Sequence, residues 1–176
     1  HTVGANSFML ACLRNSSEPE SPTLVRWQNP IEAVVRFESG GVQRTLRPDG
    51  AGNVLHGDEA REFFLEWDRG TERIAILMDK LDRYFRFYGP LNSPVDRPHL
   101  LIVTTSTARE DVIWRAVAAL QSSSAQLNAT PVATTTISLV ERYGPWNRVW
   151  RVASALRSTW PPKAPQTLRE PGGQSG

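Results

Sequence analysis

Two acidic clusters carry the residues best suited to chemistry in this chain. Asp49 follows Pro48, and Glu66 and Asp68 follow the apolar run 63–65. Because turn-forming residues separate the clusters, we expect a hairpin to bring Asp49, Glu66 and Asp68 together. Converging carboxylates repel one another unless a cation lies between them, and oxygen ligands favour Mg²⁺ or Mn²⁺. The sequence therefore predicts a metal site, and the alternative is a surface hairpin with solvated acids.

The segment that follows is expected to be an amphipathic helix over residues 72–88, with Thr71 as its N-cap. Apolar residues recur at helical spacing: Ile74, Leu77, Met78, Leu81, Phe85 and Tyr88. On this helix Arg73, Lys80 and Tyr84 share one flank of the apolar face. A lysine beside the carboxylates would contact a phosphate and stabilise charge in phosphoryl transfer. The alternative is a solvated lysine paired with neighbouring acids.

These residues resemble the replication-relaxation family, whose members occur on bacterial plasmids and integrative elements. The resemblance covers roughly residues 1–115, and its most specific block is Glu66–Thr71. Members of the family look similar to the restriction-endonuclease-like fold, whose motif is Pro-Asp followed by Asp/Glu-x-Lys. Asp68 stands where that motif has its lysine, and Lys80 is the expected substitute. The resemblance also implies that an N-terminal winged-helix region of the parent protein is absent from this chain.

The resemblance implies a DNA-processing domain that cleaves, by nicking, with Mg²⁺ or Mn²⁺. Its expected catalytic residues are Asp49, Glu66, Asp68 and Lys80, and its expected metal ligands are Asp49, Glu66 and Asp68. Its expected DNA contacts are Arg47, Arg69, Arg73 and Tyr84. DNA is the expected partner, together with other replication or conjugation proteins. Two further interpretations stay open: a non-catalytic DNA-binding or assembly module with the same fold, and part of a transcriptional regulator.

Length and composition are those of one globular domain. The chain has 176 residues, of which 40% are hydrophobic and 22% charged, and we expect a single domain over 1–160 followed by a disordered tail over 161–176. No apolar run approaches the roughly 20 residues of a membrane span. A lone Cys12 excludes a disulfide framework. We therefore expect a cytoplasmic protein without membrane contact.

Near the C-terminal end, arginines alternate with aromatic residues: Arg142, Tyr143, Trp146, Arg148, Trp150, Arg151, Arg157 and Trp160. Arginine and aromatic side chains suit phosphate contact and base stacking. We expect a helix over about 146–157 to carry these residues, and the alternative to nucleic-acid contact is that its apolar residues pack on the sheet.

The order of expected elements predicts an α/β fold with a mixed sheet flanked by helices. It fits an αβββαβ core, as in restriction-endonuclease-like proteins, plus a C-terminal strand and helix. The expected helices are 1–14, 72–88, one beginning with a Thr107-x-x-Glu110 capping box, and 146–157. The expected strands are 23–28, 42–47, 62–67, 99–105 and 131–140. Residues 30–37 are expected to be a strand or a short helix, and 50–53 and 56–59 to be turns.

Overall fold

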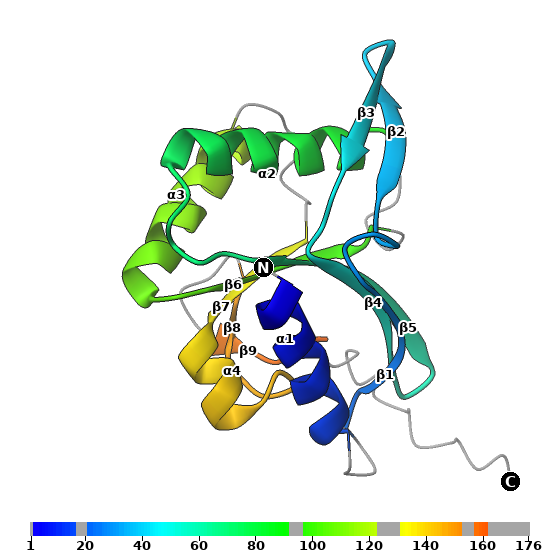
Figure 1. Ribbon diagram of the computed structural model, residues 1–176, viewed down its shortest axis with the longest axis vertical. Coiled ribbons are helices and arrows are strands. Elements are labelled where there is room, and N and C mark those ends of the chain that lie inside the picture. Colours follow the sequence, from blue (N-terminus) through cyan, green and yellow to red (C-terminus); the bar gives the residue numbers. More distant parts are fainter. Residues whose placement is uncertain (1, 17–20, 92–96, 123–130, 153–156, 162–176) are drawn as a thin grey trace, which may run out of the picture.

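The computed structural model describes residues 2–16, 21–91, 97–122, 131–152 and 157–161 (Figure 1). The helices are α1 (Thr2–Arg14), α2 (Ile74–Tyr88), α3 (Thr107–Ser122) and α4 (Ile137–Tyr143). The strands are β1 (Thr23–Gln28), β2 (Val35–Ser39), β3 (Val42–Leu46), β4 (Gly50–His56), β5 (Glu59–Trp67), β6 (His99–Thr104), β7 (Val132–Thr136), β8 (Trp150–Arg151) and β9 (Arg157–Ser158). Among these residues no helix is both long and apolar enough to cross a membrane.

Within the described residues, the main sheet has seven strands in the order β1-β4-β5-β6-β7-β8-β9. Strands β5, β6 and β7 run parallel, whereas β1, β4, β8 and β9 join by antiparallel pairing. Strands β2 and β3 form a separate two-stranded antiparallel sheet. The mixed sheet predicted from the order of elements is therefore confirmed.

Helices cover both faces of the sheet. Helices α1 and α4 lie on one face and α2 and α3 on the other (Figure 1). Side chains of a strand alternate between faces, so Phe63, Leu65 and Trp67 of β5 pack on the α1 side while Phe64 packs on the α2 side. Burial of each large apolar side chain contributes about 1.5–3 kcal/mol. This alternation also fixes Glu66, the neighbour of Leu65, on the face that α2 covers.

Strand β4 corrects the expectation of a turn at 50–53. A Cβ atom on Gly50 would lie 2.5 Å from the Trp27 ring, and one on Gly52 would lie 2.7 Å from the Arg26 carbonyl oxygen. Glycine inside a strand marks such a close approach of neighbouring groups. The hairpin next to Glu66 is therefore β4–β5, and it turns at Gly57, where φ is +61°.

Strand β3 confirms the strand expected at 42–47, but its partner is β2 and not β5. The turn between them uses Gly40 and Gly41, with φ of 62° and 73°. Residues 30–33 form a turn, and β2 follows it. The β2–β3 hairpin projects past the end of α2 (Figure 1).

Two helix starts differ from expectation. Helix α2 begins one residue after Arg73, which is its N-cap in place of Thr71. The capping box expected at Thr107 is wrong, because the Arg109 N–H donates to Ser106 Oγ at 3.2 Å. Glu110 is instead fully buried and accepts a hydrogen bond from the Thr134 hydroxyl at 2.6 Å.

The C-terminal tryptophans belong to the core, which confirms the packing alternative but not the helix over 146–157. Trp146, Trp150 and Trp160 share one apolar cluster with α1. Gly144, with φ of +80°, and the proline after it end α4, so Trp150 enters β8. Trp146 and Trp150 are spaced as in a helix, but they lie in separate segments that pack against the same core. Residues 153–156 of that expected helix and 162–176 of the expected tail lie outside the described residues.

Candidate functional site

Strands β4 and β5 bring Asp49 and Glu66 together. Asp49 precedes β4, and its N–H donates to the Leu65 carbonyl oxygen at 2.9 Å. Its carboxylate Oδ2 accepts a hydrogen bond from the Trp67 N–H, also at 2.9 Å. Because Gly50 pairs with Leu65 in the antiparallel ladder, Asp49 lies opposite Glu66. Opposite residues of such a ladder point to the same face, so the two carboxylates share the α2 side of the sheet.

Helix α2 supplies the groups that hold Glu66, whose exposed fraction is 4%. The Tyr84 hydroxyl donates to Glu66 Oε1, and Lys80 Nζ lies 2.6 Å from Glu66 Oε2. Lys80 and Tyr84 are four residues apart, so they stand one helical turn above each other. The flank expected from the helical wheel is confirmed for these two residues.

The electrostatics of Glu66 and Lys80 follow from their different burial. Burial raises the pKa of Glu66 to about 7, Lys80 opposes this rise, and Asp49 adds to it. Burial lowers the pKa of Lys80, but the neighbouring carboxylates outweigh burial, so that pKa is raised. The raised pKa of Glu66 disfavours the ion pair, whereas the raised pKa of Lys80 favours it. The Glu66 side chain is 6% exposed and that of Lys80 28%, so desolvation falls mainly on the carboxyl. The pair forms as pH rises through about 7.

Asp68 has a separate set of partners, which come from the end of β6, the first turn of α3 and the turn after β5. Arg109 Nε lies 2.9 Å from Asp68 Oδ2, and Arg109 Nη2 lies 3.2 Å from Oδ1. The Thr104 hydroxyl donates to Oδ2 at 2.7 Å, and the Gly70 N–H donates to Oδ1 at 3.1 Å. Burial raises the pKa of Asp68, but these hydrogen bonds lower it by more, so the net shift is downward. Asp68 thus joins α3 to the end of β5.

The role of Asp68 as metal ligand or base remains a prediction that these contacts do not favour. In the part of the chain that the structure describes, no group of three or more His, Cys, Asp or Glu side chains is placed to hold a metal ion. Sequence reasoning missed Arg109 and Thr104. The one available signal was position, since both residues flank the junction between an expected strand and the helix after it.

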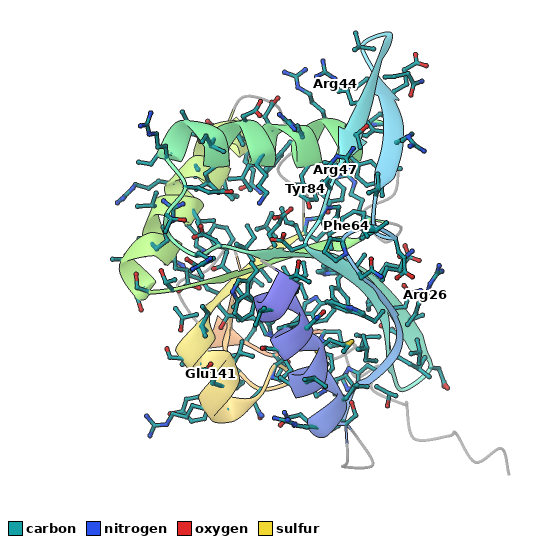
Figure 2. The ribbon with its side chains drawn as sticks, viewed as in Figure 1. Arg26, Arg44, Arg47, Phe64, Tyr84 and Glu141 are labelled. Carbon is teal, nitrogen blue, oxygen red and sulfur yellow. The ribbon has the colours of Figure 1, made fainter. Side chains whose placement is uncertain are left out.

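Of the expected DNA-contact residues, Arg47, Arg69 and Arg73 are exposed. Tyr84 is 1% exposed and therefore cannot reach DNA without unpacking α2. This corrects its expected role, because the Tyr84 hydroxyl holds Glu66 instead. Figure 2 shows Arg47 near the base of the β2–β3 hairpin, while Tyr84 packs against Phe64 with ring centroids 5.8 Å apart.

Two hollows meet at Arg47. The larger, of about 670 Å³, lies beside Asp49 and is lined by Pro30, Ile31, Val34, Arg36, Arg47, Pro48 and Asp49. The smaller, of about 360 Å³, lies between β3 and α2 and is lined by Gln43, Arg44, Thr45, Arg47, Asp79, Asp82 and Arg83. Arg36 and Arg47 line the hollow beside Asp49, and two cations against one carboxylate favour an anionic ligand there.

A profile described as replication-relaxation matches residues 1–95 of the 176. The chain belongs to the replication-relaxation family. The match contains Asp49, Glu66, Asp68 and Lys80 and ends short of the expected boundary near 115, so β6, α3 and Arg109 lie outside it. No curated protein and no solved structure matches the chain.

Proposed function

We propose that this domain processes DNA during replication or transfer of a plasmid or other mobile element, by metal-dependent cleavage of a phosphodiester. Membership of the replication-relaxation family supports a role in replication. The observation that carries the proposal is the grouping of Asp49, Glu66 and Lys80 at one place. Two carboxylates with a lysine beside them are the set used for metal-assisted phosphodiester hydrolysis in a restriction-endonuclease-like fold. The site would act in the cytoplasm, with DNA as its partner.

The donor set of Asp49 and Glu66 fits Mg²⁺ or Mn²⁺. Mg²⁺ is commonly held by one or two carboxylates, with water and phosphate oxygens completing its shell. Glu66 Oε2 is buried and accepts no well-aligned hydrogen bond, although Lys80 Nζ lies 2.6 Å away. This oxygen is therefore suited to a cation, and Lys80 now fills that place. When bound, the ion would polarise the phosphodiester and lower the pKa of a water molecule.

The residues of the chain then have separate tasks. Tyr84 fixes the orientation of Glu66 by donating to Oε1. Lys80 is partly exposed and has a flexible stem, so its ammonium group would turn from Glu66 to the phosphate and stabilise developing charge there. Arg47 and Arg69, both exposed, would contact flanking phosphates. Because the pKa of Glu66 is about 7, the carboxylate form needed for cation binding grows as pH rises through neutrality.

A non-catalytic DNA-binding module is the second candidate, and one observation favours it. The buried acids already have partners without a metal ion: Glu66 has Lys80 and Tyr84, and Asp68 has Arg109. In that case the cluster would stabilise the fold, and the arginines around the hollows would supply affinity for phosphate.

The two candidates differ in one experiment, the nicking of supercoiled plasmid in Mg²⁺ or Mn²⁺, with DNA affinity measured in parallel in EDTA. A catalytic site predicts nicking by wild type and about 100-fold or greater loss in Lys80→Ala, with affinity nearly unchanged. A binding module predicts intact plasmid and a Lys80→Ala variant with weaker, less salt-dependent binding. Arg115→Ala, which removes an exposed arginine of α3 outside both hollows, is the matched control.

A further inference from the structure

The hollow beside Asp49 combines apolar and cationic side chains. Pro30, Ile31 and Val34 come from the segment before β2, whereas Arg36 belongs to β2 and Arg47 follows β3. Two arginines and one aspartate line the hollow, so its lining carries a net positive charge. The volume of the hollow, about 670 Å³, falls in the range of sites that take small organic molecules, roughly 300–1,000 Å³. Such a lining suits a ligand with an apolar ring at one end and a phosphate at the other.

The turn before β2 presents Ile31 in a fixed position. Asn29 Oδ1 accepts hydrogen bonds from the N–H groups of Ile31 and Glu32, at 2.9 and 3.2 Å. Glu32 Oε2 in return accepts one from the Asn29 N–H at 3.0 Å. This reciprocal pattern is a capping box, which holds the turn. Ile31 is 86% exposed, and although a lone exposed isoleucine is ordinary, this one is held at a cation-lined hollow.

Alternation along β2 directs Arg36 outward. Its neighbours Val35 and Phe37 pack inward against the α2 core, and Phe37 meets Phe87 of α2 with ring centroids 5.5 Å apart. Side chains of a strand alternate, so Arg36 must point away from α2, and it is exposed. Arg47 follows Leu46, the buried last residue of β3, and lines the same hollow as Arg36. The packing of the hairpin on α2 therefore holds both cations at the hollow.

We propose that this hollow binds one unpaired nucleotide of a DNA strand next to Asp49. The base and sugar would lie against Pro30, Ile31 and Val34, and the adjoining phosphates would contact Arg36 and Arg47. A paired base is stacked and its edges are occupied, so an apolar pocket can receive a base only from a single strand or after flipping. The inference rests on the proposed function in taking DNA as the ligand, and it adds that the preferred substrate is single-stranded or locally opened.

The test is the fluorescence anisotropy of a labelled thymidine 12-mer and of a duplex of the same length, titrated with the protein in EDTA. Wild type should bind the single strand more tightly. Ile31→Ser should weaken single-strand binding about fivefold, the loss of part of one apolar contact, and leave duplex binding unchanged. Ile31→Trp should tighten single-strand binding, because a flat ring stacks on a base. Arg36→Ala should flatten the salt dependence by about 0.7 in slope.

The controls are Val3→Ser, which removes an 82% exposed aliphatic residue of α1, and Arg115→Ala. Equal affinity for duplex and single strand, or an Ile31→Ser effect no larger than that of Val3→Ser, would overturn the inference. Tighter binding of the matching uridine RNA would overturn DNA as the ligand. Binding is measured in EDTA, where no cleavage occurs, and nicking is measured separately in Mg²⁺ or Mn²⁺. Binding that depends on Ile31, together with no nicking in the second assay, would support the hollow as a DNA site and reject catalysis. Nicking by a protein whose single-strand binding does not depend on Ile31 would support catalysis and reject the hollow as a DNA site.

Discussion

The buried charge of Glu66 makes a direct prediction about stability and pH. The pKa of Glu66 is raised from 4.5 to about 7 in the folded protein, mainly by burial. A carboxyl group whose pKa rises on folding contributes its stability fully below the unfolded pKa and loses it as pH rises through the folded pKa. A shift of this size is worth about 3 kcal/mol at about 1.4 kcal/mol per unit.

Glu66→Gln removes this titration while keeping a side chain of the same size. The free energy of unfolding of wild type, minus that of Glu66→Gln, should fall by about 3 kcal/mol between pH 4 and pH 8. Urea unfolding at a series of pH values in EDTA measures this difference. Glu141→Gln is the matched control, because Glu141 is exposed on α4, on the face of the sheet opposite α2 (Figure 2). Its difference from wild type should stay flat.

Lys80→Met sharpens the same test. The positive charge of Lys80 lowers the pKa of Glu66, so its removal should raise that pKa further and move the loss of stability to higher pH. A difference between wild type and Glu66→Gln that stays flat, or rises, from pH 4 to pH 8 would refute the desolvation argument. A Lys80→Met variant with an unchanged profile would refute the coupling between the two residues.

Three further predictions concern other parts of the molecule. Asp68→Asn should lower the free energy of unfolding at pH 7 by about 2 kcal/mol, since it removes the charge that pairs with Arg109 and leaves that guanidinium bonded to the Glu72 carbonyl oxygen. Chemical unfolding measures this, and a change below about 0.5 kcal/mol would contradict the pairing. Because the pKa of Asp68 is lowered, the difference should shrink as pH falls below about 4. Trp160→Ala should lower the free energy of unfolding by about 3–5 kcal/mol, as measured by urea unfolding. If Trp160 instead contacted DNA, the substitution would leave stability unchanged and weaken DNA affinity. The Tyr84→Phe variant should fold, but the pH at which its plasmid nicking reaches half its maximum should rise. The reason is that Glu66 loses a hydrogen-bond donor that favours its ionised form. An unchanged pH profile of nicking would show that Tyr84 does not tune Glu66.

Local patterns in the sequence were sufficient where one element determines the outcome. The apolar residues of 74–88 recur at helical spacing, and this places Lys80 and Tyr84 on one flank of α2. Alternation in 63–67 sends Glu66 toward that helix. Asp49 was also expected near Glu66, and it lies there, although by way of the β4–β5 hairpin.

Contacts between distant segments account for what the sequence did not reveal. Gly50 and Gly52 have the composition of a turn, yet their lack of side chains accommodates Trp27 and the backbone of β1. Asp68 was expected to join the other acids, but an arginine 41 residues later in the chain takes both its oxygens. Neither the contact of Gly50 with Trp27 nor the pairing of Asp68 with Arg109 can be identified from sequence spacing alone. Trp146 and Trp150 recur at a helical interval, yet they lie in separate segments that pack in one core cluster, so this interval does not mark a helix.

The proposed catalytic site requires that Asp49 and Glu66 together hold one divalent cation. Titration of Mn²⁺ followed by electron paramagnetic resonance at pH 8, where Glu66 is ionised, counts the bound ions. We expect one site per chain in wild type, no site in Asp49→Asn or in Glu66→Gln, and weaker binding at pH 6 than at pH 8. Binding that survives both substitutions, or that does not change between these pH values, would contradict the account.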